Sequence, residues 1–137
     1  MPESFQLTVL TPVRTLLDER VESVVAPGAE GYLGVLANHA PLITALIPGK
    51  LTARLEDGET RVFALSGGFF EVSANRAVIL ADAMEEPGQI DIDRAKRAAE
   101  RARERLRDIQ GKRDVERAQA ALARALNRAK VAGEPRD

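Results

Sequence analysis

Few side chains in this sequence could carry out acid–base or nucleophilic chemistry. The 137 residues contain one histidine, His39, and no cysteine, which removes thiolate catalysis and cysteine-based zinc sites. Ser66 could act as a nucleophile beside His39, but Leu65-Ser66-Gly67-Gly68 lacks the elbow sequence that exposes a nucleophilic serine. We interpret His39 as a hydrogen-bonded turn or interface residue. The sequence therefore predicts no catalytic or metal centre, and a protein that is not an enzyme.

Two other patterns resemble parts of known active sites, and each has a simpler structural explanation. Gly28, Gly31 and Gly34 recur at every third position, as in some phosphate loops, but no helical pattern follows them. We therefore predict a loop here without phosphate binding. Asp91 and Asp93 could form an acid–base pair, but both also suit the start of a helix, where Asp91 would be the N-cap.

Basic side chains are concentrated in one C-terminal segment. Residues 91–131 hold 13 Lys and Arg against 7 Asp and Glu, whereas residues 1–90 hold 6 against 12. A basic block on an otherwise acidic chain is typical of an interaction surface. The alternative is a solvated helix face with ion pairs three or four residues apart. Its candidate pairs are Glu100 with Lys96 or Arg103, Glu104 with Arg101 or Arg107, and Asp108 with Arg105.

The basic segment has three candidate partners. Nucleic acid would bind through its phosphates, but residues 91–137 contain no aromatic side chain that could stack on a base. Anionic lipid is a second candidate, although a surface of alanine and arginine has no bulky apolar face to insert. An acidic protein surface is the third, because arginine binds carboxylates through paired donors.

The elements that must position these charges are two helices that fold back on each other. Apolar side chains recur in alternating steps of three and four residues, which keeps one narrow seam facing a partner helix. The break at Gly111-Lys112 is too short to carry the second helix elsewhere. Six of the eleven seam positions are alanine and bury little area, so we expect a hairpin that can detach. The seam consists of Ile92, Ala95, Ala99, Ala102, Leu106 and Ile109, then Val115, Ala118, Leu122, Ala125 and Ala129.

The first 86 residues have the pattern of short strands joined by tight turns. Alternating or β-branched apolar runs predict the strands, while Asp57-Gly58 and Ala74-Asn75 predict hairpin turns. Such spacing favours an antiparallel β-sandwich or flattened barrel. The predicted fold class is therefore mainly β plus α. The expected strands are residues 5–10, 21–26, 51–55, 61–65, 69–72 and 77–80.

Chain-wide properties narrow the class of protein. No apolar stretch approaches the roughly 18 residues that span a bilayer, and residues 1–7 lack the basic and apolar regions of a signal peptide. We expect a soluble, cytoplasmic chain. Its expected parts are a β-sandwich over residues 1–86 and a linker with a helical hairpin over residues 87–137.

Residues 4–131 also resemble the epsilon subunits of F-type, proton-translocating ATP synthases. The resemblance rests on two motifs and on the order of sandwich, linker and basic hairpin; together, at this chain length, these features are specific. It implies a β-sandwich of about ten strands and an antiparallel two-helix hairpin. The motifs are Gly31-Tyr32-Leu33-Gly34-Val35-Leu36-Ala37-Asn38-His39-Ala40-Pro41-Leu42 and Ser66-Gly67-Gly68-Phe69-Phe70-Glu71-Val72.

The resemblance implies a non-catalytic rotor subunit that couples proton flow to ATP synthesis. Its sandwich would bind the gamma subunit and the membrane rotor ring, at the cytoplasmic face of the bacterial plasma membrane and without inserting into the membrane. Glu30, Gly31, Tyr32 and His39 match the loop that faces the ring in that family. The hairpin would extend into the catalytic hexamer, where its basic residues meet an acidic segment of the beta subunits and inhibit ATP hydrolysis.

The resemblance further implies ATP as a regulatory ligand that holds the hairpin folded, with no cofactor required. The family motif Ile/Leu-Asp-x-x-Arg-Ala is matched by residues 90–95, although Pro87-Gly88 alters the linker before it. Arginines and a helix N-terminus both suit phosphate. The alternative function is a free-standing nucleic-acid-binding basic helical hairpin on a β-domain. The implied ATP-binding set is Glu85, Ile90, Asp91, Arg94, Ala95, Arg101, Arg124 and Arg128.

Overall fold

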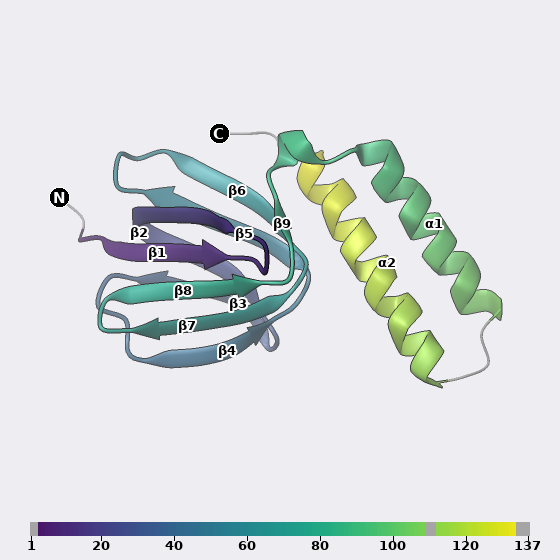
Figure 1. The fold of residues 1–137 in the computed structure, drawn as a ribbon, viewed down its shortest axis with the longest axis horizontal. Helices are drawn as coiled ribbons and strands as arrows, with labels where there is room; N and C mark the ends of the chain where they lie inside the picture. Colours follow the sequence, from purple (N-terminus) through teal and green to yellow (C-terminus); the bar gives the residue numbers. More distant parts are fainter. Residues whose placement is uncertain (1–2, 109–111, 134–137) are drawn as a thin grey trace.

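A computed structural model of the chain, which describes residues 3–108 and 112–133, shows a β-sandwich followed by two helices (Figure 1). The strands are β1 (Phe5–Leu10), β2 (Thr15–Gly28), β3 (Gly31–Leu36), β4 (Leu42–Leu46), β5 (Gly49–Leu55), β6 (Thr60–Leu65), β7 (Gly68–Ser73), β8 (Arg76–Ala81) and β9 (Met84–Glu85). The helices are a short 3-10 helix, η1 (Pro87–Gln89), and two α-helices, α1 (Ile92–Asp108) and α2 (Lys112–Ala132).

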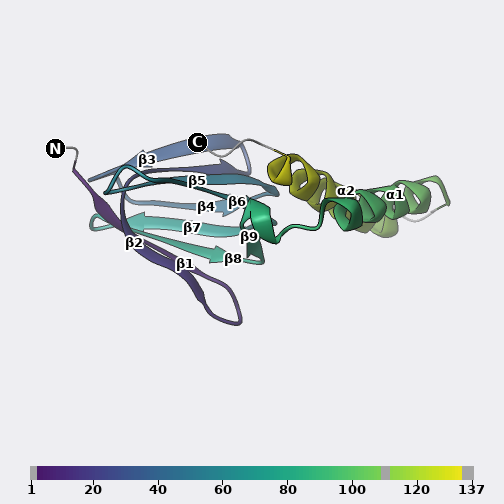
Figure 2. The same cartoon turned by 90° about the horizontal axis from the view of Figure 1, so that it is seen from above.

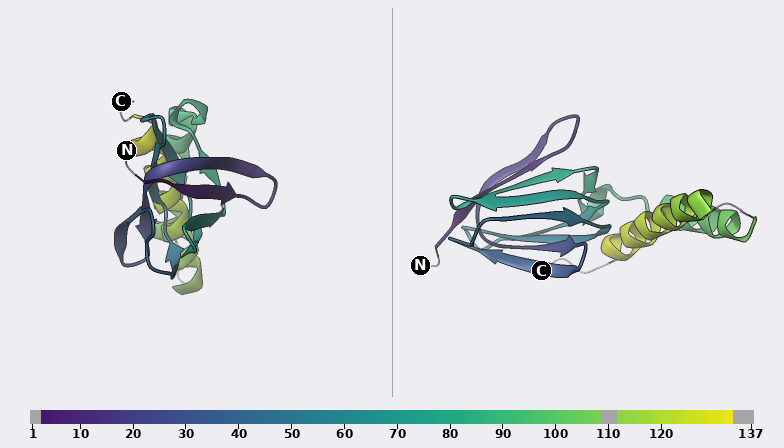
Figure 3. Two further views of the ribbon diagram at one scale, coloured as in Figure 1. Left: turned by 90° about the vertical axis from the view of Figure 1, so that its left-hand side faces the viewer. Right: turned by 90° about the horizontal axis from the view of Figure 1, so that it is seen from below.

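The strands form two layers that share the long strand β2. Neighbouring strands follow the order β1-β8-β7-β4-β2-β5-β6-β9, and β3 pairs with β2. The two layers are seen from above in Figure 2, and the connection between β1 and β2 projects beyond them in Figure 3. The prediction of a sandwich of about ten strands is confirmed, with nine strands among the described residues. One pair departs from the antiparallel pattern, because β1 runs parallel to β8.

The core lies between the layers and follows the alternation of the sequence. In β1 the side chains of Phe5, Leu7 and Val9 are buried, and the residues between them are partly exposed. The same alternation buries Phe70 and Val72 in β7. Each fully buried side chain of this size contributes about 1.5–3 kcal/mol relative to exposure. The sandwich therefore has an apolar core of its own.

Both predicted hairpin turns are confirmed. Gly58 joins β5 to β6 with φ of 92°. Ala74 and Asn75 join β7 to β8 with φ of 49° and 57°, as a two-residue turn between right-twisted strands requires. Only glycine adopts such angles without steric cost, and asparagine tolerates them better than alanine.

The prediction of a loop across the three glycines is wrong in its extent. Gly28 is the last residue of β2, and Gly31 and Gly34 lie in β3, so that only a tight turn separates the strands. Residues 42–46, for which we predicted no strand, form β4 against β7. In both cases cross-strand pairing to a long or buried partner outweighs weak local propensity.

The two α-helices lie side by side and antiparallel, as the heptad pattern predicts (Figures 1 and 3). Five of the six seam alanines are buried, Ala129 and the larger seam residues are partly buried, and Ile92 is exposed at the start of α1. Ile109 and the break at Gly111 lie outside the described residues. The buried alanines are Ala95, Ala99, Ala102, Ala118 and Ala125.

Candidate functional site

Among the described residues, the hairpin meets the sandwich at a small junction, where α2 contacts β5, β6 and the linker helix η1. Its apolar part is a cluster of Ala64, Ile90 and Val131, against which Val62 and Ala132 pack. Val131 has no exposed surface, although it lies in the last turn of α2. We call this cluster, together with the polar contacts described next, the docking junction.

An ion pair links α2 to the strand that leads into the linker. The guanidinium of Arg128 donates to both carboxylate oxygens of Glu85, from Nε at 2.6 Å and from Nη2 at 3.0 Å. Both side chains are about 30% exposed. This two-point geometry gives orientation as well as attraction, and at such exposure we expect a contribution of about 1 kcal/mol.

Asn127 adds two neutral hydrogen bonds beside the ion pair. Its side-chain nitrogen donates to the carbonyl oxygen of Gly49 at 2.9 Å and to that of Leu65 at 3.2 Å. Gly49 and Leu65 face each other across β5 and β6. One amide group, with two N–H donors, therefore binds the ends of two strands at once.

The linker is fixed to β6 by Arg61. Its guanidinium donates to Glu86, the residue before η1, and lies 5.3 Å from the centre of the Phe63 ring. A cation above an aromatic ring gains further electrostatic attraction. The linker therefore enters α1 from a defined position.

Asp91 caps α1, as the sequence predicts. Its carboxylate accepts a hydrogen bond from the backbone N–H of Arg94 at 3.0 Å, and its carbonyl accepts one from Ala95. Both bonds satisfy the start of a helix. Asp93 lies in the first turn, where its charge suits the helix dipole.

The structure brings together only part of the residue set implied for ATP. Glu85 and Arg128 bind each other, and Ile90 and Ala95 are buried in the junction and the seam. The exposed residues of the set are Asp91, Arg94, Arg101 and Arg124. The exposed arginines and the N-terminus of α1 suit phosphate, but a phosphate would compete with Glu85 for Arg128. The set therefore fits an anion in part.

The residues expected to face a rotor ring do not form one loop. Glu30 and Gly31 lie at the turn between β2 and β3, with Tyr32 next to them, and Glu30 and Tyr32 are exposed. His39 follows the other end of β3, where its Nδ1 lies 2.7 Å from the carbonyl oxygen of Ala40. Only the turn with Tyr32 lies at the end of the sandwich that contacts α2.

Sequence reasoning missed an apolar patch on the outer face of the sandwich. Phe69 on β7 and Leu80 on β8 lie opposite each other and are 58% and 53% exposed. Leu10 on β1 is the parallel partner of Leu80, and Ala45 on β4 is the partner of Phe69. We call these four residues the outer patch. The alternation in residues 68–73, which buries Phe70, could have placed Phe69 outside.

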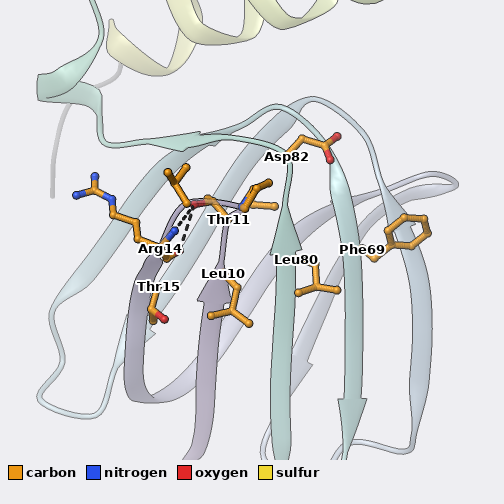
Figure 4. A pocket seen from close by; sticks show the side chains of 10 residues that line it. Leu10, Thr11, Arg14, Thr15, Phe69, Leu80 and Asp82 are labelled. Carbon is orange, nitrogen blue, oxygen red and sulfur yellow. Dashed lines mark hydrogen bonds between the residues drawn. The ribbon is translucent and has the colours of Figure 1, made fainter.

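A groove adjoins the outer patch (Figure 4). It lies between the β1–β2 connection and the ends of β7 and β8, with Thr11 bonded to Arg14 at one side and Asp82 at the other. Val13, at the tip of the connection, is exposed as well. Large exposed apolar side chains that gather at one place are typical of protein-binding surfaces.

Ion pairs are few among the described side chains of the two helices. Of the predicted pairs, Glu100 does bind Arg103, at 3.5 Å, and it also binds Arg107, at 3.6 Å. The side chain of Asp108 lies outside the described residues. Within the described part of the chain, no group of three acidic, histidine or cysteine side chains could hold a metal, and no helix is long and apolar enough to cross a membrane.

Comparison with known proteins assigns the chain to a family. Residues 4–87 match the beta-sandwich domain of the ATP synthase Delta/Epsilon chain, and residues 89–133 match its long alpha-helix domain. The ATP synthase epsilon chain of Moorella thermoacetica is 47% identical over 95% of this chain and 97% of its own length. That of Desulforamulus reducens is 46% identical over 96% and 99%.

Two solved structures have the same arrangement of elements. A chain of the Euglena gracilis mitochondrial ATP synthase, solved as an OSCP/F1/c-ring assembly, is similar with a TM-score of 0.79 and 26% identity, covering 90% of this chain and 78% of that one. A chain of the Tetrahymena thermophila mitochondrial ATP synthase central stalk/c-ring is similar in fold alone, with a TM-score of 0.72 and 17% identity over 95% of this chain and 97% of that one. With both parts of its length matched in order, this chain belongs to the Delta/Epsilon chain family of ATP synthases.

Proposed function

We propose that this chain is the epsilon subunit of a bacterial F-type ATP synthase and acts as a non-catalytic part of its central stalk. The observation that carries the proposal is near full-length similarity, at 47% identity, to a relative named ATP synthase epsilon chain. The chain has one histidine and no cysteine, and its polar contacts bind elements of the fold together. The comparisons give the nucleic-acid alternative no support.

The sandwich is the part that would bind the stalk and the rotor ring. The outer patch offers apolar surface to a stalk partner, for which gamma is the expected subunit, and Glu30, Gly31 and Tyr32 offer a polar turn to the ring. His39, at the far end of β3, would contact a different part of the assembly. Such a subunit would lie at the cytoplasmic face of the membrane without entering it.

The hairpin is the part that would regulate hydrolysis. Its seam is built from small side chains, and among the described residues its main contact with the sandwich is the docking junction, so release costs little apolar contact. Once extended, its exposed arginines would bind an acidic segment of the beta subunits in the catalytic hexamer. That position would hinder rotation in the direction of ATP hydrolysis.

The inhibitory role is tested in the assembled enzyme. Deleting residues 88–137 should leave the complex assembled and raise its ATPase activity. Replacing exposed Arg101 and Arg105 by glutamine should raise activity as well, whereas replacing both by lysine should retain most inhibition. Unchanged ATPase activity in the deletion variant would contradict the inhibitory role.

ATP is proposed as the regulatory ligand of this hairpin. The proposal is supported by the match to Ile/Leu-Asp-x-x-Arg-Ala at residues 90–95, by the capped N-terminus of α1 and by exposed arginines on both helices. Calorimetry at millimolar ATP should give a binding heat, and Arg94→Ala with Arg101→Ala should remove it. The absence of any heat with the unaltered chain would end the proposal.

A further inference from the structure

The side chain of Tyr32 accepts a hydrogen bond from the backbone of a neighbouring strand. The residue is 60% exposed, while its hydroxyl accepts a hydrogen bond from the backbone N–H of Lys50 at 2.8 Å. It is the only tyrosine of the chain, and the chain has no tryptophan. The fluorescence of this tyrosine can therefore report the surroundings of the ring without an added label.

The strand register explains why a side chain supplies this acceptor. Val25 of β2 lies opposite Thr52 of β5, and continuing the register by two residues places Pro27 opposite Lys50. Proline has no N–H, and the carbonyl of Pro27 already accepts a hydrogen bond from Ile47. The hydroxyl of Tyr32, the β3 partner of Pro27, takes the place of a ladder acceptor.

The peptide group that contains the Lys50 N–H also accepts a hydrogen bond from the hairpin, on its opposite side. Asn127 donates to the carbonyl of Gly49, and the N–H that reaches Tyr32 belongs to Lys50, so both bonds end on the Gly49–Lys50 peptide. The C=O and N–H of a trans peptide point in opposite directions and are fixed in one plane. A hydrogen bond to the carbonyl also polarises the N–H and strengthens its bond.

Close packing around Gly49 leaves the Gly49–Lys50 peptide little room to change its orientation. A Cβ atom on Gly49 would lie 2.4 Å from Cβ of Pro27 and 2.8 Å from the hydroxyl of Tyr32. Gly49 is buried, and Pro27 and Tyr32 occupy the space that a side chain at this position would need. A change in the orientation of this peptide must therefore move the hydroxyl of Tyr32.

We propose that Asn127, the Gly49–Lys50 peptide and Tyr32 form a hydrogen-bond chain through which docking of the hairpin fixes the position of the Tyr32 ring. When α2 leaves the docking junction, the carbonyl of Gly49 loses the hydrogen bond from Asn127 and the ring loses part of its restraint. By linkage, a protein that packs on the ordered Tyr32 ring favours the docked hairpin, and one that displaces the ring favours its release. The choice of the rotor ring as that protein rests on the proposed function; the hydrogen-bond chain itself does not.

The test uses the isolated full-length chain and the exchange rate of the Lys50 amide proton, measured by NMR. Tyr32→Phe removes the acceptor and should speed exchange about fivefold, the ratio that one ordinary hydrogen bond gives. Asn127→Ala should speed it about 1.2- to 1.6-fold, because losing the neighbouring bond weakens a hydrogen bond by roughly 10–30%, although Asn127 never touches that proton. In the double variant the second substitution should add nothing. Lys130→Ala, an exposed change on the same helix, should leave the rate unchanged.

A second measurement, of the effect of Tyr32→Phe on Asn127, keeps the test decisive if Asn127→Ala releases the hairpin altogether. Tyr32→Phe should then still speed the exchange of the Asn127 side-chain amide protons. Acrylamide quenching of the single tyrosine should also rise in Asn127→Ala. A Lys50 amide that exchanges alike with and without Asn127, or independent effects in the double variant, would overturn the proposal. Because no other subunit is present, either result stands apart from the role in an ATP synthase.

Discussion

The sandwich and the hairpin are stabilised in different ways. The fully buried side chains of the sandwich include Phe5, Phe70 and Leu51, whereas the buried seam of the hairpin consists of alanines. A buried Phe or Leu contributes about 1.5–3 kcal/mol, and a buried methyl group less than 1 kcal/mol. The sandwich can therefore keep its fold alone, while the hairpin depends on its own pairing and on the docking junction. Proteins generally open first where such packing is thinnest.

The two regions also differ in how they meet other proteins. The sandwich exposes a fixed apolar patch around Phe69 and Leu80, in which the strands set the position of each side chain. The hairpin exposes arginines on helices that can change position. A rigid binding face and a movable charged arm are suited to permanent attachment and to regulation, respectively.

The largest expected effect compares two adjacent residues of β7. Phe70→Ala should lower the free energy of unfolding by about 3–5 kcal/mol, because it leaves a cavity in the sandwich core. Phe69→Ala should change it by less than about 0.5 kcal/mol, because that ring is exposed. Urea denaturation of both variants measures the difference. Similar losses for the two would mean that the outer patch is part of the core.

A smaller effect is expected at the docking junction. Arg128→Ala and Glu85→Ala should each ease opening of the hairpin by about 1 kcal/mol, and the double variant should cost little more than either, because the two groups bind each other. Opening is measured by hydrogen exchange of α2 in low and high salt. Additive effects would show that the ion pair does not hold the helix.

The cap of α1 should matter by a similar or slightly smaller amount. Asp91→Ala should cost about 1 kcal/mol of helix stability, whereas Asp91→Asn should cost only a few tenths, because asparagine caps helices equally well. Circular dichroism during thermal unfolding, with Asp93→Asn as the control, measures this. Equal losses at positions 91 and 93 would assign the effect to charge and not to capping.

Much of the fold could be predicted because local patterns agree with the final structure. The alternation in residues 5–10, the positive-φ turn at Gly58 and the heptad seam each specify an element without reference to distant residues. The strands over residues 31–36 and 42–46 were not predicted, because these segments become strands by pairing with β2 and β7. No local signal in the sequence marks a strand that exists only beside its partner.

The junction was harder to predict than the elements it joins. Asp91 could be assigned as a cap from its own neighbours, and the family motif brought Glu85 and Arg128 into one set. Their mutual ion pair, and the contact of Asn127 with two strand ends, depend on how α2 lies against β5 and β6. The residues that form these contacts are 43 to 78 positions apart in the sequence, so their spacing alone does not predict them.

The central claim is that the hairpin is docked at one small junction and opens while the sandwich stays folded. Native-state hydrogen exchange of the full chain, followed by mass spectrometry at increasing low concentrations of urea, tests it directly. We expect the amides of α1 and α2 to exchange through an opening that costs several kcal/mol less than the opening of β1, β5 and β7. If all three strands and both helices exchange with one common free energy, the two regions form a single cooperative unit and the claim is wrong.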